Sequence, residues 1–576
     1  MMRNFLICSL LFCVYQLPAQ NVMTPELLWT LGRVSGINIS NNQQYVFYSV
    51  STPDVATNKS SSKIYRIPIN GGIAVPIDAF HVPIKLPNKN ISPDGKYILT
   101  NKMVKVEKVS GKDFYPELDK SDVMIYDNLM YRHWDEWTDG SFDHVFYSGV
   151  NSGDSARDIM YNQPYHCPTK PFGGDEDYIW SPDSKQIIYV TKQKTGKDYA
   201  VSTNTDIYAY DMASGVTKNL SDDMPGYDLA PAYSKNGLLA WLSMKRDGYE
   251  ADKQDIVVLA NGTINNLTAW RDDIHVSSFK WSNDGKVIYF IAPVNGTEQL
   301  FCLQFNQLNK KAPAITQITA GDFDITGIVG QAGNQLIVSR TDMNHAAELY
   351  KVDIADGKMH QLTHVNDKIY STLSLSKTER RIVKTTDGKS MLAWVIYPPN
   401  FDPNKKYPTL LYCQGGPQSA LTQFYSFRWN FQLMAANGYI VVAPNRRGMP
   451  GHGTQWNEQI SKDWGGQVMK DYLSAIDDVA KENYVDKSRL GAVGASYGGY
   501  SVFYLAGIHN KRFKTFIAHD GVFDLRSMYG TTEEMWFVNW DMGGAYWDKK
   551  NTVAQNTYEK YSTSNYVQNW DTPILI

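Results

Sequence analysis

Residues 490–500 read Leu-Gly-Ala-Val-Gly-Ala-Ser-Tyr-Gly-Gly-Tyr, and this stretch decides the fold of the C-terminal part of the chain. An apolar strand runs directly into Gly-x-Ser-x-Gly and then into a helix-length apolar segment, which is the pattern of a nucleophile elbow. The turn is expected to push Ser496 Oγ out of the sheet, while small neighbours let the strand and the helix approach closely. We therefore predict that Ser496 is a nucleophile and that the Tyr497 backbone N–H, at the helix N-terminus, stabilises an oxyanion. The alternative is a chance match to a short motif.

A second glycine motif lies upstream, at Gln414-Gly415-Gly416-Pro417, directly after an apolar strand. This is where an α/β-hydrolase carries its oxyanion loop, so Gly415 and Gln414 are candidate oxyanion residues. A plain tight turn is the alternative. After the next strand come Arg446 and Arg447, which either bind substrate carbonyls or form ion pairs. The residues leave these two roles open.

The segments around these motifs alternate between strands and helices, which predicts a doubly wound, mostly parallel sheet. Five strands and two helices are expected. The strands are 409–413, 439–444, 490–494, 513–518 and one beginning at 572, and the helices are 467–482 and 498–508. The C-terminal part is therefore predicted to be an α/β-hydrolase domain.

A different pattern fills residues 33 to 375. Turn motifs, such as those at 92–96, 180–185 and 281–286, each precede a β-prone run. Each of these three contains Ser and Asp and ends in Gly-Lys or Ser-Lys. They recur about every 45 to 50 residues, the spacing of four-stranded propeller blades, so we expect a β-propeller of about seven blades. A tandem of β-sandwiches is the less regular alternative.

Composition excludes several function classes. The 576 residues carry a formal net charge of -3, which gives no electrostatic case for nucleic acid or an anionic membrane. Cys167, Cys302 and Cys413 are widely spaced, so no metal site is indicated, and they read as buried thiols or as one disulfide plus a free thiol. No cofactor is implied, because acyl transfer by a serine needs none.

The N-terminus resembles a signal peptide, with Arg3, a short apolar run and Ala19 before the expected cut. The apolar run is too short to be a membrane anchor, and no later stretch is long and apolar enough to span a bilayer. We expect a signal peptide at 1–19, a propeller domain at 20–378 and a catalytic domain at 379–576, exported to the periplasm and free of the membrane after cleavage.

Taken together, these motifs resemble the prolyl oligopeptidase family of serine peptidases, which joins a seven-bladed propeller to an α/β-hydrolase domain. The resemblance spans nearly the whole chain and rests on 24–28, the propeller repeats, 414–418 and 494–500. Segments 131–137, 531–537 and 566–575 are most similar to its bacterial dipeptidyl peptidases. The resemblance implies release of dipeptides from short peptides with a free N-terminus. Oligomeric state is not readable, and a homodimer is the assembly we consider.

An exopeptidase must hold the charged substrate amine two residues from the scissile bond, and a carboxylate is its natural partner. Asp135 and Glu136, in an aromatic insertion of the propeller, are the candidates. A solvated turn is the alternative. Apolar residues near the elbow would form the substrate pocket, and Val522 and Trp536 are candidate walls together with Arg447. These residues could equally belong to the core or, for Arg447, to an ion pair.

The catalytic base is the missing part. On this fold the triad follows the order Ser, Asp, His, and His509 and His519 lie too close to Ser496 in the chain. We expect the Asp and the His beyond residue 576, so these residues alone should show little or no activity although the complete protein is active. Two other functions remain open: an acylaminoacyl-peptidase or esterase of the same family, and a propeller binding protein with an inert hydrolase domain.

Overall fold

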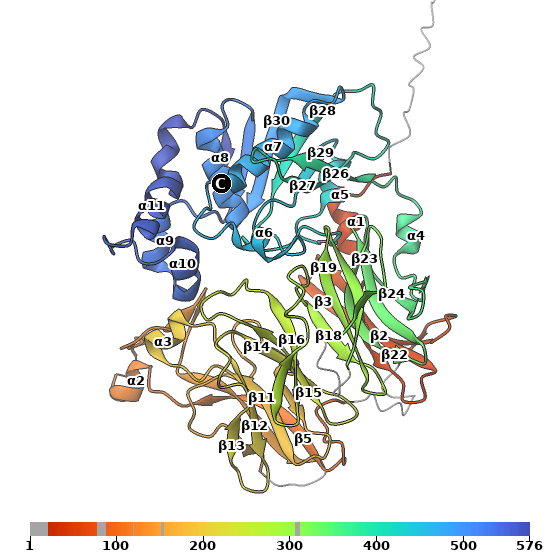
Figure 1. The fold of residues 1–576 in the computed structure, drawn as a ribbon, viewed down its shortest axis with the longest axis vertical. Helices are drawn as coiled ribbons and strands as arrows, with labels where there is room; N and C mark the ends of the chain where they lie inside the picture. The colour runs from red at the N-terminus through yellow and green to blue at the C-terminus, as the bar shows by residue number, and fades with distance from the viewer. Residues whose placement is uncertain (1–20, 78–87, 119, 151–154, 306–311) are drawn as a thin grey trace, which may run out of the picture.

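The computed structural model describes residues 21–77, 88–118, 120–150, 155–305 and 312–576. The predicted signal peptide lies outside the described residues. Figure 1 shows two parts stacked on each other, an α/β part that contains the C-terminus and a ring of β-sheets below it. Helix α1 (Pro25–Thr30) lies at the junction, where Leu28 packs in one cluster with Tyr370 and with Leu433 of the α/β part.

Six antiparallel sheets form the ring. Five of them have four strands in sequence order, and the second has three. In chain order the sheets are β1 (Arg33–Ile39), β2 (Tyr45–Asp54), β3 (Lys59–Pro68), β4 (Val75–Pro76); β5 (Tyr97–Lys105), β8 (Ser141–Gly149), β9 (Arg157–Asp158); β10 (Tyr178–Trp180), β11 (Gln186–Thr191), β12 (Asp206–Asp211), β13 (Thr217–Asn219); β14 (Asp228–Tyr233), β15 (Leu239–Met244), β16 (Gln254–Ala260), β17 (Thr263–Asn266); β18 (Ser278–Trp281), β19 (Val287–Val294), β20 (Thr297–Gln304), β21 (Ile315–Gln317); and β22 (Asp324–Ala332), β23 (Gln335–Asp342), β24 (His345–Asp353), β25 (Met359–Gln361).

The propeller prediction is confirmed in class, and its count of about seven blades is wrong: the described residues form six. Dividing the repeat region by one period overcounted because the second blade carries a long insertion. Between β5 and β8 the chain forms α2 (Gly111–Phe114) and a separate hairpin of β6 (Arg132–His133) and β7 (Glu136–Trp137). These residues add length without adding a blade.

The repeated turn motif has one hydrogen-bonding pattern. In each of three copies the serine hydroxyl, of Ser92, Ser181 or Ser282, donates to the aspartate two residues later at 2.7 Å. The same oxygen accepts the backbone N–H five residues later at 2.9 to 3.0 Å. Each motif thus closes the turn directly before a blade strand, β5, β11 or β19, which explains its blade-length spacing.

The α/β part is built on one seven-stranded sheet in the order β26-β27-β29-β28-β30-β31-β32. The five strands from β29 to β32 are parallel neighbours, as predicted, and β26 and β27 join antiparallel at one edge. The strands are β26 (Thr378–Lys384), β27 (Ser390–Ile396), β28 (Tyr407–Cys413), β29 (Ile440–Pro444), β30 (Val485–Ala495), β31 (Thr515–His519) and β32 (Ile574–Leu575). The doubly wound hydrolase sheet is confirmed.

Helices cover this sheet, in which the nucleophile strand β30 lies between β28 and β31. The predicted helices are α7 (Gln467–Val479) and α8 (Tyr497–Ile508), which pack in the largest hydrophobic cluster of the described residues. The others are α3 (Gly196–Val201) in the propeller, α4 (Asp367–Tyr370), α5 (Phe431–Ala436), α6 (Thr454–Glu458), α9 (Leu525–Thr531), α10 (Met535–Met542) and α11 (Thr552–Tyr561), with 3-10 turns at Asp175–Asp177 and Thr563–Asn569. Helix α10 packs on α3, so this helix reaches the propeller (Figure 1).

Candidate active site

Ser496 lies at the turn between β30 and α8 with φ 57° and ψ -122°. A positive φ is rare for a residue with a side chain and costs on the order of 1–3 kcal/mol, so surrounding packing must impose it. Ser496 is exposed, while residues 490–494 of the strand before it and almost all of the helix after it are buried. This is the strained, outward-facing serine that the sequence predicted.

Glycines around Ser496 allow the close approach that forms this turn. A Cβ on Gly494 would lie 2.6 Å from the carbonyl oxygen of Gly498, and one on Gly498 would lie 2.1 Å from that of Cys413. At Gly499 a Cβ would lie 2.6 Å from the carbonyl oxygen of His519. No side chain fits at these separations, so the glycines are required by the contacts of α8 with the two neighbouring strands.

The loop after β28 lies against the nucleophile. A Cβ built on Gly415 would be 3.1 Å from the carbonyl oxygen of Ala495 and 3.6 Å from Cβ of Ser496. The Gln414 side chain donates from Nε2 to Ser419 Oγ at 3.4 Å, while its Oε1 is buried without a partner among the described residues. The structure therefore brings two predicted oxyanion residues, Gly415 and Gln414, next to Ser496.

Tyr497 contributes its backbone rather than its side chain to this site. Its phenol is buried and donates to the carbonyl oxygen of Trp464 at 2.7 Å, with the two rings edge to face at 4.9 Å. Trp464 also contacts Phe537 of α10 at 5.6 Å. An aromatic chain thus joins the elbow to the helix that faces the propeller.

Neither nearby histidine is hydrogen-bonded to Ser496 Oγ among the described residues. The carbonyl oxygen of His519 accepts from the Ser496 N–H at 2.9 Å, but its ring contacts Arg428 and Asp520. His509 pairs with Asp571 at 3.2 Å, and burial lowers its pKa. Both rings already have local partners.

Arg447 is buried and fully engaged by protein groups. Its Nη1 pairs with Asp471, its Nη2 pairs with Asp387, and its Nε donates to Gln459 at 3.0 Å. Of the two roles left open for this residue, the geometry provides the ion pair. Binding a substrate through Arg447 would require these bonds to break, and a buried, separated pair is costly.

The aromatic insertion reaches across from the propeller to the α/β part. Arg132 Nη1 lies 3.1 Å from Glu533, and His133 Nε2 lies 2.9 Å from Glu534. The indole of Trp134 donates to the same Glu534 at 3.0 Å. Both segments stand out in the sequence, but the sequence does not reveal that they touch, because they are about 400 residues apart.

Asp135 and Glu136 occupy the turn and second strand of this hairpin, and both side chains are exposed. Their neighbours Arg132 and His133 hold the hairpin on the segment between α9 and α10. The side chains of the two predicted amine-binding acids are therefore exposed at the boundary between the two parts.

Trp536 is buried between the two parts, while Val522 packs at the edge of the hydrolase core. The Trp536 indole donates to Glu250 of the propeller at 3.1 Å, and its ring lies 4.6 Å from the ammonium of Lys192. Burial raises the pKa of Glu250 to about 7 and lowers that of Lys192 to about 7. No sequence pattern marked Glu250 or Lys192, because their proximity arises only when the parts dock.

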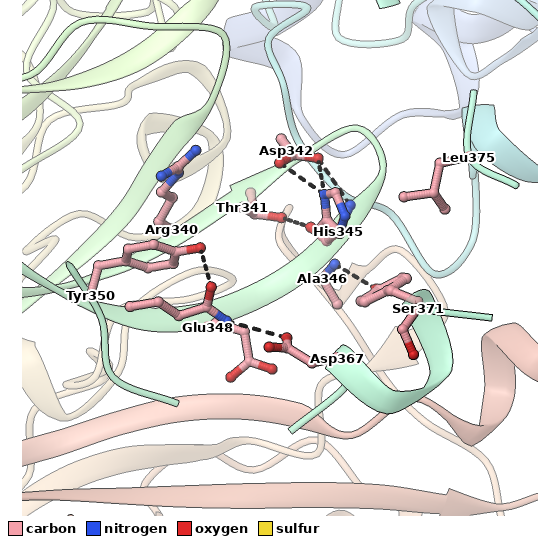
Figure 2. A pocket seen from close by; sticks show the side chains of 12 residues that line it. Arg340, Thr341, Asp342, His345, Ala346, Glu348, Tyr350, Asp367, Ser371 and Leu375 are labelled. Atoms are coloured by element: carbon pink, nitrogen blue, oxygen red, sulfur yellow. Dashed lines mark hydrogen bonds and ion pairs between the residues drawn. The ribbon is translucent and has the colours of Figure 1, made fainter. Parts of the chain in front are cut away.

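A cavity of about 520 Å³ lies elsewhere, between the last blade and α4 (Figure 2). None of the predicted site residues lines it. Its acidic groups contact other protein groups: Asp342 pairs with His345 at 2.8 Å, and Asp367 pairs with a neighbouring histidine. Glu348 accepts the Asn366 N–H through Oε1 at 3.1 Å, while its Oε2 is buried without a partner among the described residues. These polar contacts stabilise the wall of the cavity, and none of the residues that line the cavity belongs to the elbow.

The described residues show neither a metal cluster nor a disulfide among their cysteines. They contain no group of three or more His, Cys, Asp or Glu side chains placed to hold a metal ion. No helix in the described part of the chain is long and apolar enough to cross a membrane. Cys167, Cys302 and Cys413 are all free thiols, so none of them is linked in a disulfide.

The strained serine between strand and helix, with a glycine loop packed against it, defines a serine hydrolase of the α/β-hydrolase class joined to a β-propeller. Residues 425–576 match the model of the prolyl oligopeptidase family, and residues 249–391 match that of the dipeptidyl peptidase IV N-terminal region. The chain belongs to the prolyl oligopeptidase family.

Curated relatives support this assignment, and solved structures share the fold. The chain is 43% identical to dipeptidyl-peptidase 5 of Porphyromonas gingivalis, over 96% of this chain and 86% of the relative. It is 40% identical to dipeptidyl-peptidase 5 of Porphyromonas endodontalis, over 97% and 86%. Pyrococcus horikoshii acylaminoacyl peptidase shares the fold, with a TM-score of 0.75 at 18% identity over 96% of this chain and 87% of that one. Porphyromonas gingivalis dipeptidyl peptidase 4 has a TM-score of 0.55 at 15% identity, over 94% and 81%.

Proposed function

We propose that this protein is a serine-type dipeptidyl peptidase that releases dipeptides from short peptides with a free N-terminus. The observation that carries the proposal is the exposed Ser496 at φ 57°, with the backbone of Gly415 packed against it. The two relatives at 43% and 40% identity, both called dipeptidyl-peptidase 5, support the substrate class. Access to the site between propeller and hydrolase favours short peptides over folded proteins.

In this reaction Ser496 Oγ attacks the peptide carbonyl, its proton passes through a histidine to the leaving amine, and water then hydrolyses the acyl-enzyme. The carbonyl oxygen gains negative charge in the tetrahedral state. We assign its stabilisation to the backbone N–H groups of Tyr497 and Gly415, with Gln414 beside them. The base is assigned to a histidine, which the order Ser, Asp, His on this fold places after the nucleophile.

Recognition of the substrate amine is assigned to Asp135 and Glu136. Both are exposed on a hairpin that is anchored to the hydrolase by Arg132 and His133, so their carboxylates are free to pair with an ammonium. Val522 and Trp536 are proposed to form walls of the pocket for the substrate side chain. We also propose that the protein is exported to the periplasm and forms a homodimer.

The test compares dipeptidyl-coumarin substrates with a free or an acetylated amine, using the complete protein. We expect turnover of the free-amine substrate, its loss in Ser496→Ala, and wild-type turnover in the control Ser488→Ala, which changes an exposed serine of the same strand. Preference for the acetylated substrate would favour an acylaminoacyl-peptidase. Failure of a fluorophosphonate probe to label Ser496 would favour an inert hydrolase domain.

A matched pair of variants tests the amine site. Glu136→Gln and Asp135→Asn each remove a charge and keep the shape of the side chain. KM for the free-amine substrate should rise about 10- to 100-fold, because loss of a charge-assisted hydrogen bond costs on the order of 1.5–3 kcal/mol. Glu117→Gln, an exposed acid outside the hairpin, serves as the control. An unchanged KM in both test variants would exclude these acids as the amine site.

A further inference from the structure

Arg446 is a buried cation beside the elbow, and no carboxylate of the described residues pairs with it. Its relative exposure is 0%, and both nearby acids, Asp387 and Asp471, are bound to Arg447 instead. Burial acts to lower the pKa of Arg446, but adjacent phenols outweigh this and raise it, so the side chain stays charged. An unneutralised charge in the protein interior is costly, so its contacts need an explanation.

The guanidinium is bound instead to backbone carbonyls of the oxyanion loop. Nη1 donates to the carbonyl oxygen of Pro417 at 2.7 Å, and Nη2 donates to that of Gln414 at 3.1 Å. These carbonyls lie on either side of Gly415 and Gly416. Nε donates to the Tyr472 phenol at 3.0 Å, which fixes the plane of the group. Arg446 therefore holds both ends of the loop.

This contact fixes the direction of one N–H group. The Gln414–Gly415 peptide is trans, so its C=O and N–H point in opposite directions. Because the Gln414 carbonyl points at Arg446, the Gly415 N–H points away from it. Gly415 also packs against Ala495 and Ser496, so the loop is held where an oxyanion donor is needed.

Arg446 contacts the second donor segment as well. Its guanidinium carbon lies 4.7 Å from the ring centroid of Tyr497, the residue that follows the nucleophile. Gly448 provides the space for this arrangement, because a Cβ there would lie 2.8 Å from Arg446 Nη1. One buried cation thus touches both segments that are assigned as oxyanion donors.

We propose that Arg446 is a positioning residue of the oxyanion hole: it orients the Gly415 N–H toward the tetrahedral oxygen and adds an unneutralised positive charge behind it. The inference rests on the proposed acyl transfer at Ser496. Because Arg446 is buried, its charge acts most strongly on the negative tetrahedral state and little on the neutral substrate. Arg446 therefore raises kcat more than it tightens substrate binding.

The experiment compares Arg446→Met and Arg446→Lys in the complete protein. Arg446→Met should lower kcat about 100-fold or more, the usual cost of losing one oxyanion donor, with KM changed less than about threefold. Arg446→Lys keeps the charge but replaces the two separate nitrogens that bind the Pro417 and Gln414 carbonyls by one, so kcat should fall about tenfold. Arg512→Met, which removes a partly exposed arginine paired with Asp477, is the control and should retain wild-type kcat.

A second readout separates this role from general damage. Affinity for a dipeptidyl boronate, which forms a tetrahedral adduct on the serine, should fall with kcat/KM in Arg446→Met, while affinity for the product dipeptide stays unchanged. Equal losses for both ligands, or a kcat within threefold of wild type, would overturn the proposal. If Arg446→Met does not fold, the same two affinities are measured on Arg446→Lys, where an unimpaired kcat would also overturn it.

The control Ser496→Ala separates failure of this inference from failure of the proposed function. Turnover that persists in Ser496→Ala would refute the nucleophile itself. Loss of turnover in Ser496→Ala, combined with normal kcat in Arg446→Met, would refute only the role of Arg446.

Discussion

Gly498 is the position where one added methyl group should damage the site most. It follows the nucleophile by two residues in α8 and packs on the end of β28. In Gly498→Ala the new Cβ would lie 2.1 Å from the carbonyl oxygen of Cys413 and 3.0 Å from its carbonyl carbon. These are backbone atoms, so the contact cannot be relieved by turning a side chain.

The distance by which the helix and the strand must separate sets the expected loss of stability and of kcat. Ordinary contact begins near 3.4 Å, so the helix and the strand must separate by about 1.3 Å. Overpacking of this kind costs roughly 1–3 kcal/mol of the free energy of unfolding. Because Cys413 directly precedes the oxyanion loop, the same shift moves the loop relative to Ser496, and a misplacement of about 1 Å lowers kcat about 100-fold.

The assay pairs Gly498→Ala with Gly530→Ala, in which the new Cβ meets no atom within 4 Å. Alanine is the better helix former by about 1 kcal/mol, so the control should be as stable as wild type or slightly more so, with unchanged kcat. Urea denaturation gives stability, and turnover per fluorophosphonate-titrated site gives kcat. If the two variants have the same denaturation midpoint and the same kcat, the close approach at the elbow is not what positions the loop.

Three further results are expected. Burial raises the pKa of Glu250 from 4.5 to about 7, so its contribution to stability is complete below pH 4.5 and is lost as pH rises through 7. Glu250→Gln should remove up to about 3 kcal/mol of this pH dependence, and thermal melts that keep the same pH slope would contradict the assignment. Arg447→Met leaves the fully buried Asp471 unpaired and should destabilise the α/β part by about 3–5 kcal/mol, whereas an unchanged urea midpoint would show that the ion pair contributes nothing. Ser282→Ala removes three hydrogen bonds of a blade turn and should cost about 1–3 kcal/mol without changing kcat, so a loss of kcat at full stability would contradict a purely structural role.

Local patterns predicted much of the fold because the forces behind them act over a few residues. The turn at Ser92 and its two counterparts form hydrogen bonds within five residues, so their repetition was visible in the chain. The number of blades was not visible in the same way. The number of blades depends on whether a stretch of chain forms blade strands or a separate element outside the blades. The hairpin at Arg132–Trp137 is such a separate element.

The contacts between distant segments were beyond sequence reasoning. His133 and Glu534 meet across 401 positions, and Trp536 meets Glu250 across 286. No local periodicity encodes such distances, because they arise when the propeller and the hydrolase dock. Asp135 and Glu136 remain predicted amine acids on this insertion, and local sequence patterns did not mark Glu533 and Glu534 as the acids that hold it.

The sequence by itself determined the nucleophile elbow, because Gly494, Ser496 and Gly498 must be neighbours in the chain for the turn to form. Only the tertiary structure decided between the adjacent arginines Arg446 and Arg447. They have the same chemistry and differ by one position, yet one is neutralised by two carboxylates while the other holds the carbonyls of the oxyanion loop. The physical reason is that a charge acts through its neighbours in space, and those neighbours come from β28, α7 and the loop near Asp387, which only folding brings together.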